Sequence, residues 1–261
     1  PWLQSIGVVD AILPAEPGTR ALENYETNVT VRALASVETV EIPVPKALRW
    51  LAGARNTPPP PPPIARYHAP SQVDGTAPGV TFELLPIGDA SWPAGLDQSL
   101  YAAYGDAIHA YLAALPSMRA LDEEATRAVA ERCLAPFELG QALDAATLMT
   151  FGSRLHNWVQ ATHPDAIWRT EADILAPRSG GGYWRGTADL ILELPDGAHI
   201  LIDHKSAPVS RKTVENKANE YVGQLEAYQD GLSALGIPIT ASFLHFPSAG
   251  LVARMRKPDN Q

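Results

Sequence analysis

The sequence predicts an α/β or α+β domain in which helices cover a central mixed sheet. Three observations support this prediction. Helical patterns occupy residues 99–162, and three strand-like runs connected as a meander follow over residues 168–206. A long helical pattern then precedes two further strand-like runs, which end at residue 256. This order of elements favours a sheet of mixed direction with helices packed on it.

Three helices are expected before the first strand. The first has apolar residues at spacings of three and four, which define one face of an amphipathic helix. These residues are Tyr101, Tyr104, Ile108, Tyr111 and Leu112. Pro116 is expected to end that helix. Residues 122–133, rich in Glu, Ala and Arg, form the second candidate, and a third helix is expected to open at Asp144 or Thr147 and to continue through Trp158.

Alternating side chains and turn residues mark the three strands of the meander. Residues 168–175 alternate, and residues 179–182 are a glycine-rich turn. Residues 183–194 and 199–206 are expected to be the second and third strands. The hairpin signal Pro195-Asp196-Gly197 lies between these two.

The last part of the chain is expected to form one helix and two strands. Residues 212–235 have a long helical pattern, and Gly236 is placed to end it. Residues 241–246 and 251–256 are expected to be the closing strands, on either side of a turn at residues 247–250.

The first part of the chain carries no cluster of catalytic residue types. It contains two valine- and threonine-rich runs and one short helical candidate, at residues 28–32, 37–44 and 45–52. Pro58 to Pro63 is an unbroken hexaproline, which favours a stiff polyproline II spacer; a ligand for a proline-binding partner is the alternative. We place a boundary there, with residues 58–98 as a proline-rich linker. Because the chain starts with Pro1 rather than Met, we expect it to be the carboxy-terminal part of a longer protein.

Composition narrows the class of protein. Hydrophobic residues make up 46% and charged residues 19%, which is typical of a globular protein. No apolar run approaches the roughly 18 residues of a membrane span, and no secretory signal is visible, so a cytoplasmic location is expected. The single cysteine, Cys133, excludes an internal disulfide and an iron–sulfur cluster held by cysteines of this chain. The net charge of −9 argues against a free-standing nucleic-acid binder, although a nuclease site must itself be acidic.

Two aspartates and one lysine form the most informative pattern. Asp189 ends Gly186-Thr187-Ala188 within an apolar run, and Asp203-His204-Lys205 follows the next apolar run. Side chains alternate along a strand, so Asp203 and Lys205 share one face and His204 takes the other. Two carboxylates beside an ammonium suit a Mg²⁺-dependent phosphodiester hydrolase, in which Lys205 orients or deprotonates the attacking water. An ion pair at the end of a surface strand is the structural alternative.

Gln224 and Tyr228 lie four residues apart on the expected long helix, so they share one face. Gln224 could steady a water or a metal-bound group, and Tyr228 could contact a base or a phosphate. Alternatively, Tyr228 packs with Leu225 and Leu232 in the core.

Together these motifs resemble the PD-(D/E)XK nuclease superfamily, and most closely the RecB-type nuclease domain of RecB and AddA helicase–nucleases. The set comprises Gly-x-x-Asp at 186–189, Asp-x-Lys at 203–205 and Gln-Leu-x-x-Tyr at 224–228. Residues 104–109 are similar to the family's Gly-x-x-x-His helix, and Glu171 is similar to a family glutamate. The resemblance implies a restriction-endonuclease-like core with additional N-terminal helices over residues 99–261.

The resemblance also implies a metal site. Its ligands would be His109, Asp189, Asp203 and the backbone carbonyl of His204, with Glu171 close by. Lys205 would be the catalytic lysine, and Gln224 and Tyr228 would support the site or the DNA. The cation would be Mg²⁺ or Mn²⁺.

The choice of histidine stays open between two helices. Gly152 and His156 match the glycine–histidine pattern almost as well as Gly105 and His109 do. The order of elements in the family favours His109. Either histidine could instead be a core residue.

The function that the resemblance implies is a Mg²⁺-dependent deoxyribonuclease, and an exonuclease rather than an endonuclease. It would process double-strand breaks for recombinational repair and be associated with the nucleoid. No Walker-type Gly-x-x-x-x-Gly-Lys-Ser/Thr loop is present, so this stretch has no ATP site. A helicase motor, in cis or on a partner subunit, would deliver single-stranded DNA. Residues 1–57 would be the tail of such a module. A degenerate fold that only guides DNA is one alternative, and a glycosidase using the two aspartates is another.

Overall fold

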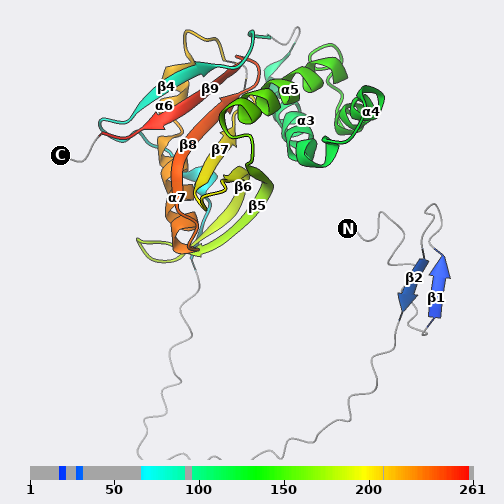
Figure 1. The fold of residues 1–261 in the computed structure, drawn as a ribbon. Helices are drawn as coiled ribbons and strands as arrows, with labels where there is room; N and C mark the ends of the chain where they lie inside the picture. Colours follow the sequence, from blue (N-terminus) through cyan, green and yellow to red (C-terminus); the bar gives the residue numbers. More distant parts are fainter. Residues whose placement is uncertain (1–17, 22–27, 32–65, 92–95, 208, 259–261) are drawn as a thin grey trace, which may run out of the picture. The chain divides into compact units, whose positions relative to one another are not determined.

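The computed structural model describes residues 18–21, 28–31, 66–91, 96–207 and 209–258, which belong to two units divided at residue 61 (Figure 1). In the first unit, β1 (Gly18–Ala21) and β2 (Asn28–Val31) form an antiparallel ribbon. The strand β2 falls in the first valine- and threonine-rich run. The second such run, the helical candidate after it and the hexaproline lie outside the described residues.

The second unit is built on a seven-stranded sheet. Its strand order is β3-β6-β7-β8-β9-β4, and β5 pairs with β6. The strands β3 and β6, and also β7 and β8, are parallel, whereas the other neighbours are antiparallel. The bounds are β3 (Tyr67–His68), β4 (Thr81–Pro86), β5 (Ile167–Pro177), β6 (Tyr183–Glu193), β7 (His199–His204), β8 (Ile239–Phe246) and β9 (Leu251–Arg256). The predicted mixed sheet and its meander β5-β6-β7 are confirmed.

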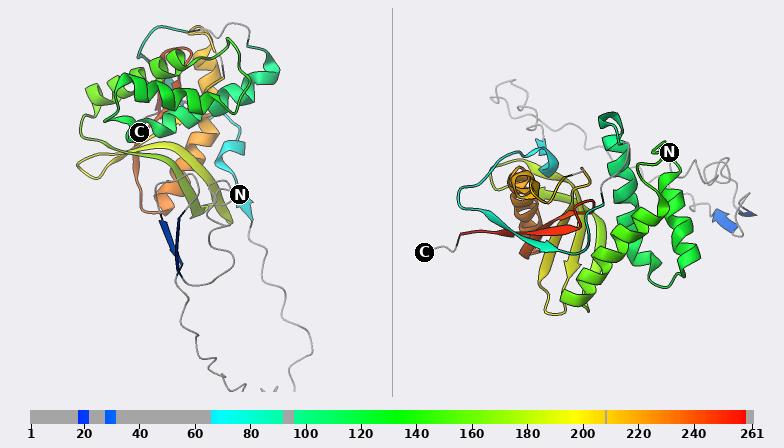
Figure 2. Two further views of the ribbon diagram at one scale, coloured as in Figure 1. Left: turned by 90° about the vertical axis from the view of Figure 1, so that its right-hand side faces the viewer. Right: turned by 90° about the horizontal axis from the view of Figure 1, so that it is seen from above.

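Helices cover both faces of this sheet (Figures 1 and 2). One core cluster joins a face of the sheet to α3 (Tyr101–Ala114), α4 (Glu123–Leu134) and α5 (Ala145–Thr162). The other cluster joins the opposite face to α6 (Val214–Asn219) and α7 (Val222–Ala234). Short 3₁₀ helices lie between these elements in the described residues: η1 (Pro70–Gln72), η2 (Gln98–Leu100) and η3 (Leu115–Met118).

Local chemistry explains where two of these helices begin. Asp122 accepts a hydrogen bond from the amide of Ala125 at 2.8 Å, and Asp144 accepts one from Thr147 at 2.7 Å. Both aspartates therefore satisfy amides that the first turn of a helix leaves free. Of the two starting points expected for the third helix, Asp144 is the N-cap.

Two predicted boundaries are wrong. The long helix expected over residues 212–235 is two helices, α6 and α7, with a break at residues 220–221. Residues 58–98 are not a linker throughout, because β3 pairs with β6 and the whole of β4 pairs with β9. The sheet domain therefore begins before residue 99.

The hairpin β5–β6 changes faces in its middle. On β5, Trp168 packs in the α3–α5 core but Ile174 packs in the α6–α7 core, although an even spacing would place them on one face. On β6, Leu190 packs in the α3–α5 core, whereas Ala188, two residues before it, packs in the α6–α7 core. The reversal lies at Glu171, whose φ is +49°, a conformation that non-glycine residues rarely adopt. The backbone is thus strained where the candidate site lies.

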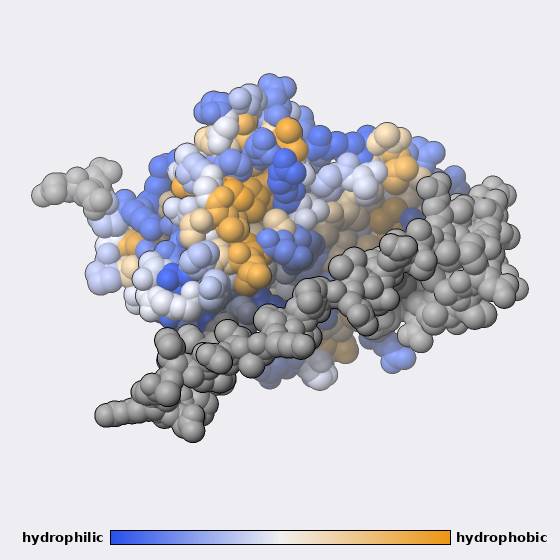
Figure 3. Space-filling view, turned by 90° about the horizontal axis from the view of Figure 1, so that it is seen from below, coloured by the Kyte–Doolittle hydropathy of each residue, from blue (hydrophilic) through white to orange (hydrophobic). Residues whose placement is uncertain are grey.

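Among the described residues, no helix is both long and apolar enough to cross a membrane. Seen from below, the surface carries hydrophobic patches between hydrophilic ones (Figure 3).

Candidate metal and catalytic site

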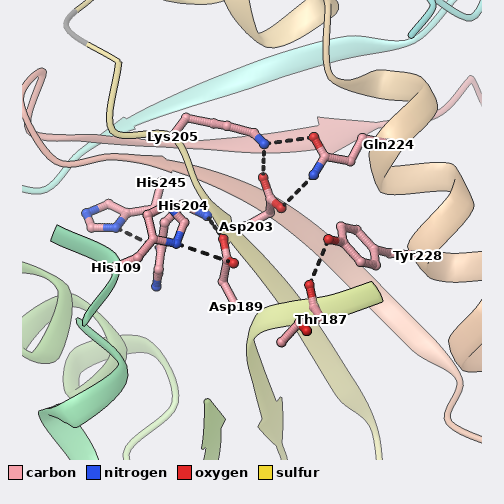
Figure 4. A network of polar contacts seen from close by, with 9 residues as sticks. All are labelled: His109, Thr187, Asp189, Asp203, His204, Lys205, Gln224, Tyr228 and His245. Carbon is pink, nitrogen blue, oxygen red and sulfur yellow. Dashed lines mark hydrogen bonds and ion pairs between the residues drawn. The ribbon is translucent and has the colours of Figure 1, made fainter. Parts of the chain in front are cut away.

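Three acidic residues lie in one row across β5, β6 and β7. Thr170 pairs with Leu190 and Ala172 with Ala188, so Glu171 lies opposite Asp189. Leu190 in turn pairs with Ile202 on the antiparallel strand β7. Asp189, which precedes Leu190, therefore lies beside Asp203, which follows Ile202. Figure 4 shows these two aspartates next to each other. The sheet register thus brings together carboxylates that are 14 or more residues apart in sequence.

Asp189 faces helix α3 and the start of the Asp-His-Lys segment. Its Oδ2 accepts a hydrogen bond from the amide of His204 at 2.6 Å, and its Oδ1 lies 3.5 Å from Nδ1 of His109 (Figure 4). Both contacts hold the carboxylate of Asp189 between β7 and α3.

Asp203, Lys205 and Gln224 form a closed triangle on the other side. Nζ of Lys205 lies 2.6 Å from Oδ2 of Asp203 and donates to Oε1 of Gln224 at 2.7 Å. Nε2 of Gln224 donates to Oδ1 of Asp203 at 3.1 Å. As the strand alternation predicts, Asp203 and Lys205 face α7 together, while the ring of His204 lies against His109 with a centroid distance of 5.8 Å.

A cation site can form from His109, Glu171 and Asp189. One ligand atom from each lies within 4.8 Å of the others. Asp203 is not in this set, which differs from the expected pairing with Asp189. Its carboxylate is turned to Lys205, because a buried carboxylate needs a nearby positive charge. The backbone carbonyl of His204, also expected as a ligand, follows Asp203 on the same strand.

The residues present fit a hard divalent cation. Carboxylate oxygens with one imidazole nitrogen suit Mg²⁺ or Mn²⁺. Oδ2 of Asp203 is buried and accepts no hydrogen bond of normal geometry from the described residues. That oxygen is therefore available as a further ligand if the contact with Lys205 opens. Glu171 is exposed, so the cluster can be reached from solvent.

Burial sets the charge state of the carboxylates. It raises the pKa of Asp203 to about 6; the Lys205 ammonium opposes this shift and the charge of Asp189 adds to it. Burial also raises the pKa of Glu171, and the Asp189 charge acts in the same direction. Burial is also the largest single influence on the pKa of Asp189 and works against its charged form. The hydrogen bond from His109 and the other contacts of His109 and His204 together outweigh it, so the pKa of Asp189 is lowered.

Burial and neighbouring charges also set the pKa values of the three histidines at the site. Burial disfavours the charged form of His109, but its hydrogen bond to Asp189 and the surrounding carboxylates prevail and raise its pKa. Burial lowers the pKa of His204 to about 4 and that of His245 well below the usual range. His204 and His245 are therefore neutral, and their Nδ1 atoms lie 3.1 Å apart, close enough for one to donate to the other.

Two glycines explain which glycine–histidine helix reaches the site. A Cβ on Gly105 would lie 2.7 Å from Oγ of Ser206, the residue after Lys205, so glycine lets α3 approach the Asp-His-Lys segment closely. A Cβ on Gly152 would instead lie 2.7 Å from the ring of Tyr111. Gly152 thus packs α5 against α3.

His156 lies away from the carboxylates. Its ring packs against Trp168 with a centroid distance of 6.0 Å. The structure therefore brings His109, not His156, to Asp189.

This arrangement predicts opposite effects for the two histidines. His109→Ala is expected to weaken Mn²⁺ binding by at least roughly tenfold, because it removes a ligand of the cluster. His156→Ala is expected to leave Mn²⁺ affinity unchanged and to lower the melting temperature, because it removes packing against Trp168. Calorimetric titration and thermal melting of both variants check this. Equal Mn²⁺ affinities of His109→Ala and the unaltered protein would contradict it.

Gln224 and Tyr228 both support the strands from α7. Tyr228 is 4% exposed, and its hydroxyl donates to the carbonyl of Thr187 on β6 at 2.8 Å. This burial leaves a base or phosphate no access to Tyr228, so its contact is with β6, two residues before Asp189. Gln224 bonds both Asp203 and Lys205 directly.

Two contributors lay outside the sequence prediction. Nζ of Lys205 lies 4.1 Å from the ring centroid of Tyr221, a cation–π contact that adds to its ion pair. Tyr221 precedes Gln224 by three residues, so helical spacing could have indicated it. The second contributor is His245, which contacts His204 because these two residues lie opposite each other where β7 pairs with β8. No local signal indicates that pairing.

Comparison with known families agrees with this geometry. Residues 85–261 match the family model described as PD-(D/E)XK nuclease superfamily. The chain belongs to the PD-(D/E)XK nuclease superfamily. No curated protein matches the chain. Among solved structures, the one described as "Crystal structure of SSO0001" is similar at 15% identity and a TM-score of 0.27, over 60% of this chain and 68% of that one, a similarity too low to argue from.

Membership confirms the superfamily and the fold expected from the motifs. It supports a nuclease that uses a divalent cation and acts on DNA. The RecB or AddA type, the helicase context and the roles of single residues remain predictions.

Proposed function

We propose that this PD-(D/E)XK domain is a Mg²⁺-dependent deoxyribonuclease of the RecB and AddA type that hydrolyses phosphodiester bonds. One observation supports the proposal above all others. The Lys205 ammonium is held by Asp203 and Gln224 directly beside the His109–Glu171–Asp189 cluster. A degenerate fold that only guides DNA has no need for this combination of a lysine with three acidic residues.

The residues divide the work between two sides of the site. His109, Glu171 and Asp189 would hold the divalent cation, with Asp203 and the carbonyl of His204 as further ligands. When bound, the cation would stabilise the charge that develops on the scissile phosphate. Lys205 orients the attacking water for in-line displacement, and Gln224 fixes the direction of the ammonium.

The finer parts of the proposal follow from the resemblance of the motifs to RecB and AddA nucleases. We propose exonuclease action on single-stranded DNA that a helicase motor delivers, in the processing of double-strand breaks. Residues 1–57 would be the tail of that helicase-like module. These statements rest on the Gln-Leu-x-x-Tyr segment at 224–228 and the Gly-x-x-x-His segment at 105–109.

A cleavage assay tests the proposal. The purified chain is incubated with single-stranded DNA labelled at either end, with Mg²⁺, with Mn²⁺ or with EDTA. We expect cleavage with either cation and none with EDTA, and products that shorten progressively from one end. Absence of cleavage together with absence of Mn²⁺ binding in a calorimeter would favour the guiding function instead.

Cation binding is expected to weaken as the pH falls through about 6. A cation must displace protons from its ligands. The pKa of Asp203 is raised to about 6, and those of His109 and Glu171 are raised too, so protons compete below this pH and leave above it. Mn²⁺ affinity should therefore fall about tenfold per displaced proton between about pH 7 and pH 5. Calorimetry at several pH values checks this, and a constant affinity would refute it.

A further inference from the structure

The outer half of the β5–β6 hairpin leaves one face uncovered. Its residues Ile174, Ala176 and Trp184 pack in the core with α7, so the intervening side chains point to the opposite face, the one that α3–α5 cover elsewhere. Figures 1 and 2 show this half of the hairpin extending past those helices. Its side chains are exposed, and the uncovered face begins at Glu171 and Asp189 of the cation cluster.

Large apolar side chains gather on this open face. Tyr67 of β3 and Tyr183 of β6 are 56% and 42% exposed, and their ring centroids lie 6.0 Å apart. Leu175, on the neighbouring strand, is 60% exposed. Three of the seven exposed large hydrophobic residues in the described part of the chain therefore lie together where β3 meets the tip of the hairpin. Exposed aromatic residues concentrated in this way indicate a binding surface.

Charge changes sign along the face. Arg185 is exposed and lies two residues after Tyr183 on β6, so both side chains share this face. The acidic residues lie nearer the cluster: Asp173, which accepts a hydrogen bond from Oγ1 of Thr187 at 3.2 Å, and then Glu171. A polyanion would thus meet the guanidinium of Arg185 near the tip and a cation at the other end.

The distance suits an extended strand. Tyr183 and Asp189 are six residues apart on β6, which corresponds to roughly 20 Å. This length accommodates a few nucleotides between the tyrosine pair and the cation cluster. Aromatic rings bind single strands by stacking with unpaired bases, whereas duplex bases are already stacked within the helix.

We propose that the open face of the hairpin and of β3 is a track for single-stranded DNA, with bases stacked on Tyr67 and Tyr183 and phosphates bound by Arg185. The proposal rests on the proposed nuclease function and identifies the surface that holds its single-stranded substrate. Stacking on one aromatic residue strengthens binding by roughly 5- to 150-fold. Because stacking does not involve the cation, binding on the track does not depend on cleavage.

Binding without cleavage tests the track. The full chain is titrated with fluorescein-labelled single-stranded DNA in EDTA, and anisotropy gives the dissociation constant. We expect the double variant Tyr67→Ala/Tyr183→Ala to bind at least tenfold more weakly than the unaltered chain. Tyr67→Phe/Tyr183→Phe keeps the rings and should bind normally. Tyr101→Ala, which removes another tyrosine that is 42% exposed, should also bind normally.

Cleavage kinetics and crosslinking complete the test. With Mg²⁺, the double alanine variant should show a raised KM and an unchanged rate at saturation. Photocrosslinking of the unaltered chain to bromouracil-substituted single strands should give adducts at Tyr67 or Tyr183, a readout independent of how any variant folds. Unchanged binding by the double alanine variant, or adducts only at residues away from the open face of β3, β5 and β6, would overturn the track. A chain that binds on the track but never cleaves would refute the nuclease alone.

Discussion

Replacing Asp189 with asparagine is expected to abolish cation binding and DNA cleavage. Asp189 lies in the centre of the acidic row, contacts His109 and lies opposite Glu171. Asparagine keeps an oxygen that can accept the hydrogen bond from the amide of His204, so the fold should survive. The loss of charge removes a ligand and also the main reason why the pKa of His109 is raised. Cleavage should fall by more than the roughly 10²–10³-fold cost of a single electrostatic contact.

The measurement combines calorimetric Mn²⁺ titration, cleavage of single-stranded DNA and circular dichroism. Asp196→Asn is the matched control, because Asp196 lies in the exposed turn after β6 and, among the described residues, accepts only a local hydrogen bond from the amide of Ala198. It should behave like the unaltered chain. If Asp189→Asn retains Mn²⁺ affinity, the cluster is not the cation site.

Lys205→Ala is expected to lower the cleavage rate by about 10²–10⁴-fold while cation binding persists. The ammonium of Lys205 is not part of the cation cluster, and its three contacts are Asp203, Gln224 and the ring of Tyr221. Removing it deprives the attacking water of its orienting group. It also leaves Asp203 without its counter-charge, so the pKa of Asp203 should rise further and the pH needed for Mn²⁺ binding should shift upward.

Single-turnover cleavage rates at several pH values check this second prediction. Lys257→Ala is the control, because Lys257 likewise donates to a glutamine of α7, Gln229, at 2.9 Å but lies on the surface. Its rate should stay within about twofold of the unaltered chain, as is usual for exposed contacts. A Lys205→Ala chain that cleaves at the full rate would remove Lys205 from the mechanism.

Local patterns predicted much of the domain because they depend on neighbouring residues. The alternation around Asp203 and Lys205 correctly placed both side chains on one face, which in the structure is the face covered by α7. Pro116 correctly predicted the end of the first helix, and of the two starts left open for the third helix, Asp144 is the one that caps it. The motif spacings also gave the superfamily, since each motif is a local feature of one strand or helix.

Features that depend on pairing between distant segments were not predictable. The strand β3 has two residues, too few for any periodicity, and it joins the sheet only through β6. The contact between His204 and His245 depends on the register of β7 with β8. The reversal of faces at Glu171 requires a positive φ, which the sequence there does not indicate. The preference of Asp203 for Lys205 over the cation cluster likewise follows from tertiary distances.

Anomalous diffraction from a crystal soaked in Mn²⁺ tests the central claim most directly. We expect one strong peak at roughly 2.0–2.3 Å from His109 and Asp189, with Glu171 or Asp203 completing the ligands. The same crystal of Asp189→Asn should show no peak there. A Mn²⁺ peak only elsewhere on the molecule, with this cluster empty, would contradict the account.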